Sequence, residues 1–284
     1  MPDREDRQEA EREGLPVKQR EVVIEFDRVA LSFEEKVVFR DISFCLERGE
    51  TKVILGVAAS GKSVLLKLTM GLLKPDSGRI FVFGKEITGL GERELFVVRQ
   101  KIGMLFQEGA LFDSLTVAEN VGYVFDRRHD MTAEESERRV RESLRFVELE
   151  QTMDLLPSEL SGGMRRRVGI ARAVVGPPEL MLYDSPTAGL DPITASRITT
   201  LIIKQRDVSR VSSLLVTHRL QDGYQIALTY YDAGQEKLLP AARNGSRRDT
   251  HTRFLMLRDG DILFHGTLSE LCAQKDPYVK KFLV

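Results

Sequence analysis

The amino-acid sequence predicts an α/β fold with a core of parallel strands, an antiparallel β subdomain and a helical subdomain. Two short apolar runs, residues 180–184 and 214–218, each end in a polar residue, which is typical of buried parallel strands. Strand-like runs separated by turns occupy residues 21–50 and 79–83. From about residue 108 to 163 the apolar residues recur with helical periodicity. We therefore expect one parallel sheet with two smaller subdomains.

Composition and charge limit the classes of function. A hydrophobic fraction of 42% over 284 residues is ordinary for a globular protein with a substantial core. Lys+Arg 42 and Asp+Glu 43 give a formal net charge of -1, so the charge favours no nucleic-acid partner. No apolar run approaches the roughly 18 residues needed to cross a bilayer, and residues 1–10 have no apolar core of a signal peptide. We expect a cytoplasmic protein.

The two cysteines, Cys45 and Cys272, lack the spacing of metal ligands. Buried free thiols in a reducing compartment are therefore expected, rather than a disulfide.

Changes in composition predict the domain boundaries. Residues 1–20 carry dense charge of both signs and too few large apolar residues to offset the entropy of ordering, so a disordered tail is expected. Residues 21–270 form the main domain, which the helical subdomain at about 108–163 interrupts. Residues 271–284 form a C-terminal helical extension.

Capping and turn signals locate further elements. Thr132 and Glu135 have the spacing of a capping box before a helix. A polar stretch covers residues 229–252, and residues 253–266 predict a hairpin that turns at Asp259 and Gly260.

A complete glycine-rich phosphate-binding motif lies between an apolar strand and a helical pattern. The two glycines let the backbone close around phosphates, the lysine can reach the β and γ oxygens of a nucleoside triphosphate, and the last serine can ligate Mg²⁺. The alternative is a strand-to-helix turn that contains Gly-Lys-Ser by chance. The motif consists of Gly56, Val57, Ala58, Ala59, Ser60, Gly61, Lys62 and Ser63.

A second predicted anion site begins another helix. Ser161 is placed as an N-cap, and Gly162 and Gly163 form the first turn, where backbone amides lack helical partners. N-capped helices with glycines are also common without any ligand.

Single polar residues at strand ends complete the candidate site. Asp184 ends an apolar run and can hold the water shell of Mg²⁺, as a Walker B aspartate does, and Asp191 follows shortly after it. His218 ends the next apolar run and can contact a γ-phosphate, while Gln107 can ligate Mg²⁺ or position water. Taken singly, such an aspartate often caps a turn and such a histidine is often structural.

These motifs, in this order, resemble the nucleotide-binding subunit of ATP-binding-cassette (ABC) transporters over about residues 21–270. The resemblance implies an ABC ATPase domain that binds ATP and Mg²⁺, with Gln107, Ser185, Asp191 and His218 at catalytic positions. It implies a head-to-tail homodimer in which Ser161, Gly162 and Gly163 act in trans, and a polytopic membrane permease as partner. Phe33 matches the aromatic position that stacks on adenine, although a core position is an equal alternative.

Three further segments are similar to the ATPases of bacterial Mla-type transporters, which move phospholipid with MCE-domain proteins. The segments are residues 104–112, Met164 and residues 276–283. This likeness implies a location on the inner face of the cytoplasmic membrane, contact with an MCE-domain protein through the permease, and docking of the permease's coupling helix at residues 108–125. An apolar-rich segment there can equally be core. An ABC importer for another substrate is an alternative, and a repair or translation cassette is weaker, because the chain lacks a long coiled-coil insertion and a second motif set.

Two residues depart from the family pattern. Ala59 stands where a small glycine is common, which we expect to be tolerated only if φ there is negative. Ser185 stands where the family has the glutamate that polarises the attacking water, and a serine hydroxyl is a poor base. A slow or inactive ATPase is therefore an alternative, namely a module that closes on ATP without rapid hydrolysis.

Overall fold

The computed structural model describes residues 21–125, 131–243, 246–247 and 249–283. The predicted tail at residues 1–20 lies outside the described residues.

The core is a six-stranded sheet with the order β14-β13-β3-β8-β7-β6. The five strands from β13 to β6 are parallel, and β14 pairs antiparallel with β13, which confirms the predicted hairpin. All five residues of β3 and of β8 are buried, as expected for a sheet covered on both faces. The strands are β3 (Thr51–Leu55), β6 (Ile102–Leu105), β7 (Leu180–Asp184), β8 (Ser212–Val216), β13 (Thr252–Arg258) and β14 (Asp261–Gly266).

The predicted antiparallel subdomain is a four-stranded sheet with the order β2-β1-β4-β5. Its inward side chains alternate with exposed ones, and the rings of Phe26 and Phe44 stack with centroids 4.7 Å apart. The strands are β1 (Val22–Phe33), β2 (Lys36–Glu47), β4 (Ser77–Val82) and β5 (Lys85–Glu86).

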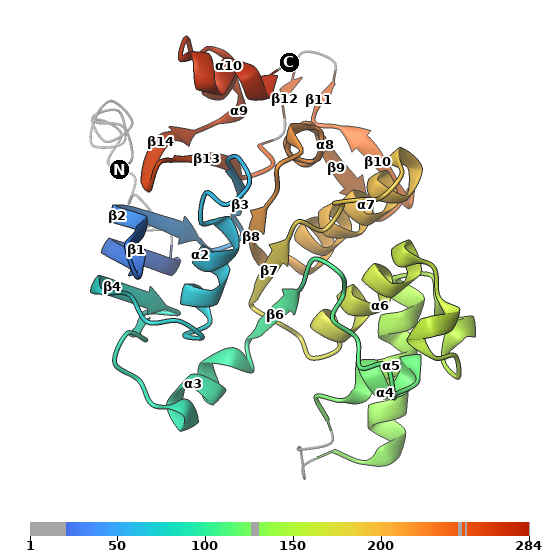
Figure 1. Ribbon diagram of the computed structural model, residues 1–284. Helices are drawn as coiled ribbons and strands as arrows, with labels where there is room; N and C mark the ends of the chain where they lie inside the picture. The colour runs from blue at the N-terminus through green and yellow to red at the C-terminus, as the bar shows by residue number, and fades with distance from the viewer. Residues whose placement is uncertain (1–20, 126–130, 244–245, 248, 284) are drawn as a thin grey trace, which may run out of the picture.

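Six helices belong to the core sheet, and three further helices with two 3₁₀ turns form the helical subdomain in the part of the chain that the structure describes. Figure 1 shows the core strands between the antiparallel sheet on one side and α4 and α5 on the other. The helices with the core are α2 (Lys62–Thr69), α3 (Glu92–Arg99), α7 (Pro192–Ser209), α8 (Leu220–Leu228), α9 (Leu268–Cys272) and α10 (Pro277–Leu283). The helical subdomain contains α4 (Val117–Gly122), α5 (Ala133–Phe146), the 3₁₀ turns η1 (Glu150–Thr152) and η2 (Pro157–Glu159), and α6 (Gly162–Val174).

Alternate residues of β3 belong to two hydrophobic clusters. Val53 and Leu55 face the cluster shared with the helical subdomain, and Ile54 faces the cluster shared with the antiparallel sheet. The two smaller subdomains therefore pack on opposite faces of the sheet, and β3 is held between them.

Two expectations need correction. Cys272 is exposed and Cys45 is half-buried, because Cys272 ends the short surface helix α9. The stretch 229–252 is not merely polar. It forms two small hairpins, in which β9 (Thr229–Asp232) pairs with β10 (Lys237–Pro240) and β11 (Ala242–Arg243) pairs with β12 (Ser246–Arg247).

Within the described residues, no helix is both long and apolar enough to cross a membrane.

Candidate functional site

Four of the predicted site segments lie at one edge of the core sheet. β3, β8, β7 and β6 are parallel, so their carboxyl ends meet at that edge. The glycine-rich loop follows β3, His218 follows β8, Ser185 follows β7 and Gln107 follows β6. The topology therefore brings together four segments that are far apart in the sequence.

The loop from Gly56 to Gly61 leads into α2, and the first backbone amides of that helix have no hydrogen-bond acceptor among the described residues. Gly61 has φ +89°, and a methyl group on it would lie 2.7 Å from the Phe39 ring, so only glycine fits there. α2 has no side-chain cap, and among the described residues nothing accepts from the amides of Lys62 or Ser63. These donors at a helix N-terminus suit a phosphate group.

Ala59 corrects the expectation stated for it, because its φ is +61°. Ala59 lies in the turn that is closed by the bond from the Ser60 amide to the Val57 carbonyl oxygen at 3.3 Å. The left-handed conformation costs an alanine about 1–2 kcal/mol. The loop forms nonetheless, so negative φ is not a condition for alanine at this position.

Lys62 is almost completely buried under the loop. Its Nζ donates to the carbonyl oxygens of Gly56 at 2.8 Å and Val57 at 2.7 Å. Burial lowers the pKa of Lys62, and the nearby Asp184 carboxylate opposes this shift. The ammonium is therefore held inside the curve of the loop, where a phosphate would sit.

Ser63 and Asp184 meet across 121 residues of sequence. Ser63 Oγ donates to Asp184 Oδ1 at 3.0 Å, and Ser185 Oγ donates to the same oxygen at 3.3 Å. Ser185 has φ +47°, and its amide donates to Val216 O at 2.8 Å, which fixes the end of β7 against β8. Ser63 and Asp184 thus present two oxygen ligands beside the phosphate loop.

Gln107 and His218 are exposed at the same edge. The carbonyl of Gln107 accepts from Arg166 Nε at 2.7 Å, so α6 holds the segment after β6 in place. The sequence analysis missed Arg166, and only its place five residues after the N-cap Ser161 could have suggested it.

Asp191 is the N-cap of α7. Its Oδ1 accepts from the amides of Ile193 and Thr194, both at 3.0 Å, and bonds from Thr194 lower the pKa of Asp191. The carboxylate is therefore occupied in capping a helix.

Ser161 caps α6, as predicted, by accepting from the amide of Met164 at 3.2 Å. Gly163 packs against α7, because a methyl group on it would lie 2.4 Å from Thr194 Cγ2. None of the hydrogen bonds among the described residues joins residues 161–163 to the phosphate loop.

Phe33 ends β1 with 45% of its surface exposed, so it is not a core residue. A ring in this position is free to stack on a planar ligand.

Tyr278 on α10 also contacts the loop. Its hydroxyl accepts from the Val57 amide at 3.2 Å and donates to Leu257 O at 3.1 Å. Tyr278 lies in the Mla-like segment 276–283, but no local sequence signal gave it a role at the loop, because it contacts the loop only through the fold.

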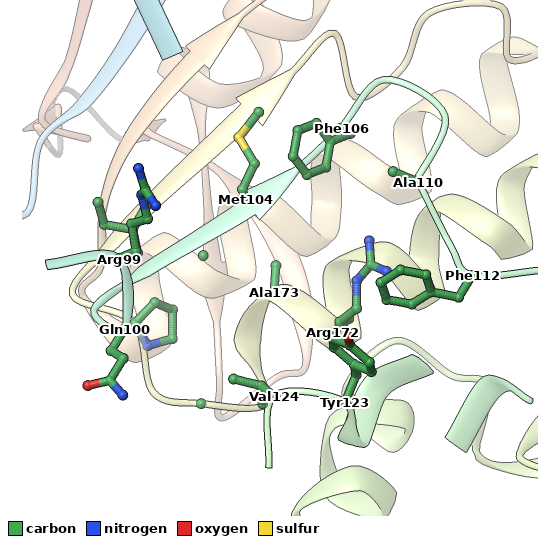
Figure 2. Close-up of a pocket in the computed structure, with 14 residues that line it drawn as sticks. Arg99, Gln100, Met104, Phe106, Ala110, Phe112, Tyr123, Val124, Arg172 and Ala173 are labelled. Carbon is green, nitrogen blue, oxygen red and sulfur yellow. The ribbon is translucent and has the colours of Figure 1, made fainter. Parts of the chain in front are cut away.

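A cavity of about 330 Å³ opens where the segment after β6 meets the helical subdomain. Figure 2 shows Phe112 and Tyr123 side by side, with Arg172 next to Phe112. Phe112, Tyr123 and Val124 are each about 40% exposed, whereas Val117 and Val121 are buried. Residues 108–125 therefore contain both core positions and an exposed apolar surface.

Comparison with known proteins identifies the family. Residues 39–188 match the family model described as ABC transporter. The chain belongs to the ABC transporter family. It is the ATP-hydrolysing subunit of a transporter, and ABC cassettes act as dimers with membrane permeases.

Curated relatives of this ABC ATPase include one named for phospholipid transport and one named for methionine import. The chain is 34% identical to the chloroplastic protein TRIGALACTOSYLDIACYLGLYCEROL 3 of Arabidopsis thaliana, over 92% of this chain and 73% of that protein. It is 31% identical to the intermembrane phospholipid transport system ATP-binding protein MlaF of Escherichia coli, over 92% and 88%. It is also 38% identical to a methionine import ATP-binding protein of Bifidobacterium longum, over 72% of this chain and 53% of that protein.

A solved ABC cassette has the same fold. The dimeric ATP-binding cassette MJ0796, in a post-hydrolysis state bound to ADP and Pi, matches with a TM-score of 0.71 and 28% identity over 86% of this chain and 98% of that one.

The residues at the sheet edge fit the ATP and Mg²⁺ that ABC ATPases use. The free amides of α2 and the Lys62 ammonium suit phosphate oxygens. Within the described part of the chain, no three or more His, Cys, Asp or Glu side chains gather in a metal-binding group. A site with one carboxylate and one hydroxyl, completed by phosphate and water, is typical of Mg²⁺.

Proposed function

We propose that the chain binds Mg·ATP on the loop from Gly56 to Ser63 and hydrolyses it slowly, in a head-to-tail homodimer that drives a phospholipid transporter. The observation that carries the nucleotide part is the 3.0 Å contact between Ser63 Oγ and Asp184 Oδ1, directly beside the buried Lys62. Two oxygen ligands next to a cation and free amides match a triphosphate with its metal.

The chain's own residues have distinct roles in this proposal. The α2 amides and Lys62 bind the β- and γ-phosphates, and Ser63, Asp184 and Gln107 hold Mg²⁺ with its waters. Bound Mg²⁺ would neutralise charge on the phosphate oxygens. His218 contacts the γ-phosphate, Phe33 stacks on adenine, and Asp191 acts by holding the N-terminus of α7. Ser185 supplies no base, so positioning and electrostatics provide the catalysis.

The second subunit completes each site. Ser161 is exposed and caps α6, and its helix N-terminus is not bonded to the phosphate loop of its own chain. We infer that Ser161, Gly162 and Gly163 contact the nucleotide held by the partner subunit. A helix N-terminus there would add amide donors to the γ-phosphate.

The apolar cavity beside α4 supports the permease interaction. Phe112, Tyr123 and Val124 are exposed apolar residues that line the same cavity as Phe106, which directly precedes Gln107, so a helix that docks there would contact the segment after β6. We propose that a polytopic permease binds this surface, which places the subunit on the cytoplasmic face of the membrane. The name of the Escherichia coli relative supports phospholipid as the substrate. An MCE-domain protein that contacts the chain through the permease belongs to the same proposal.

A second candidate function rests on Ser185. If the neutral Ser185 hydroxyl cannot replace the glutamate, ATP binding closes the dimer but ATP hydrolysis is very slow. The chain then acts as a nucleotide-gated module. Import of another substrate is the alternative within the family.

Binding of Mg·ATP to Lys62→Ala tests the nucleotide site. We expect loss of detectable binding by calorimetry with an unchanged circular dichroism spectrum, since the Lys62 ammonium lies inside the curve of the loop and bonds to loop carbonyls. Lys67→Ala is the matched control, because Lys67 is an exposed lysine in the last turn of the same helix. Equal affinity of the two variants would refute the site assignment.

Purification from detergent-solubilised membranes tests the transport assignment. A polytopic membrane protein should copurify and crosslink to a probe at Phe112 or Tyr123, and the complex should bind phospholipid rather than methionine. Recovery of only DNA-repair or ribosomal proteins would reject it.

A further inference from the structure

The strongest unassigned feature is a buried carboxylate between the turn after β7 and the loop after β8. Asp222 lies in the first turn of α8 with 4% of its surface exposed. Burying an ionisable carboxylate costs free energy unless hydrogen bonds compensate, and a first-turn acidic residue normally points to solvent. The burial of Asp222 therefore calls for a specific set of partners.

Those partners come from both catalytic segments. Asp222 Oδ2 accepts hydrogen bonds from Thr187 Oγ1, which is two residues after Ser185, and from Thr217 Oγ1 at 3.1 Å, which directly precedes His218. Thr187 and Thr217 are 0% and 1% exposed, so water does not compete for these bonds. One carboxylate oxygen thus joins two segments that approach the nucleotide from different strands.

Arg219 closes the same network. Its amide donates to Thr217 Oγ1 at 3.0 Å, and its Nη1 donates to the carbonyl of Thr187 at 3.2 Å. Its Nε lies 3.9 Å from Asp222 Oδ1. The two segments are therefore connected by side chains and by backbone, with no solvent-exposed link at the two threonines.

We propose that Asp222 is a positioning residue for ATP hydrolysis, which fixes the segment of Ser185 relative to the segment of His218 through the hydroxyls of Thr187 and Thr217. This inference rests on the proposed function of the site. Because Ser185 is a poor base, the rate depends on how well His218 and the strand end are aligned on the γ-phosphate. Loss of the network should therefore lower kcat and leave ATP affinity, which depends on the phosphate loop, almost unchanged.

Isosteric valine variants test the coupling in the full-length chain. Hydrogen exchange followed by mass spectrometry should show faster exchange in residues 214–222 for Thr187→Val, and faster exchange in residues 183–191 for Thr217→Val. Each increase should be about threefold or more, because losing a buried hydrogen bond shifts a local opening equilibrium by that order. Exchange in residues 56–63 should not change. Thr199→Val is the matched control, because Thr199 is equally buried and its hydroxyl donates to Ala195 O within α7.

ATPase kinetics in the complex with its permease give the catalytic readout. Thr187→Val, Thr217→Val and Asp222→Asn should each lower kcat about tenfold with KM changed less than about twofold. Thr187→Ser and Thr217→Ser keep the hydroxyl and should restore kcat, and the double valine variant should be no slower than the slower single variant.

The inference is overturned if each valine variant loosens only its own segment, or if kcat is unchanged in all three variants. The threonine variants decide the matter even if Asp222→Asn fails to fold. Failure of the proposed function would instead appear as unimpaired ATP binding in Lys62→Ala. The effect of each valine variant on hydrogen exchange in the other segment would be measurable whether or not the proposed function is correct.

Discussion

The hydroxyl of Tyr278 lies 3.2 Å from the backbone nitrogen of Val57, so the last helix of the chain contacts the phosphate loop. The same hydroxyl reaches Leu257 O at the end of β13, and the Arg258 guanidinium lies over the Tyr278 ring. A single phenol thus ties the loop to the neighbouring strand, and the loop's shape depends on a helix far along the sequence.

Removing this hydroxyl should weaken nucleotide binding. In Tyr278→Phe the Val57 amide loses its acceptor and the loop becomes less ordered, which should raise the Kd for Mg·ATP about two- to tenfold, the range of one neutral hydrogen bond. Titration with a fluorescent ATP analogue measures this. Tyr224→Phe is the control, because that hydroxyl contacts only Cys272 Sγ, at 3.8 Å, in the described structure. Equal affinities in the two variants would show that the contact does not order the loop.

The phosphate site was predictable because its information is local. Residues 56–63 are contiguous, and a strand, a glycine loop and a helix follow from their composition alone. The N-cap roles of Thr132 and Ser161 were predictable for the same reason, and both are confirmed.

Contacts that exist only after folding were not predictable. Tyr278 and Val57 are separated by 221 positions, and Thr187 and Asp222 by 35, so no periodicity or spacing connects them. The expectation that Ala59 needs a negative φ was wrong, because Ala59 lies in a turn closed by the Ser60 amide and the Val57 carbonyl oxygen and has φ +61° there. The hairpins formed by β9–β12 were not predicted, because strands of two to four mostly polar residues show no clear alternation of apolar and polar side chains.

Adjacent glycines at the start of α6 should respond differently to alanine. Gly163→Ala places a methyl group 2.4 Å from Thr194 Cγ2 and should destabilise the fold by about 1–3 kcal/mol through overpacking against α7. Gly162→Ala meets only Arg165 Nη2, at 4.0 Å, and should be neutral or slightly stabilising. Urea unfolding of both variants measures the difference. Similar losses for the two would mean that α6 does not pack on α7 as described.

The acid stability of the protein should depend on His265. Burial, with the Lys52 ammonium beside it, lowers the pKa of His265 to about 4, and its Nε2 lies 2.7 Å from Lys52 Nζ. The unfolded chain has the ordinary pKa of about 6.5 and binds more protons between these values, so stability is complete above that range and falls as the pH drops from 6.5 to 4.

In His265→Gln, a neutral acceptor remains beside Lys52 but no longer titrates. The pH dependence of the unfolding free energy over that range should then be shallower by up to about one proton. Urea unfolding at several pH values between 4 and 7.5 gives the two slopes. Parallel slopes would mean that His265 contributes nothing to acid sensitivity.

The residue with the largest expected effect on rate is Ser185. Its hydroxyl donates to Asp184 Oδ1 at 3.3 Å. Ser185 directly follows β7, at the position where the resemblance to ABC ATPases implies a glutamate. A positioned base contributes about 10²–10⁴ in rate, and in a homodimer both sites lack it. Ser185→Glu should therefore raise turnover in the assembled transporter at least about tenfold. Mg·ATP affinity should change little, because Lys62 and Ser63 are untouched.

The control is Ser185→Gln, whose side chain has nearly the same shape as that of Ser185→Glu without the carboxylate and should not raise the rate. If Ser185→Gln accelerates as much as Ser185→Glu, shape rather than basicity is responsible, and if neither accelerates, the serine enzyme already hydrolyses ATP without a base at this position.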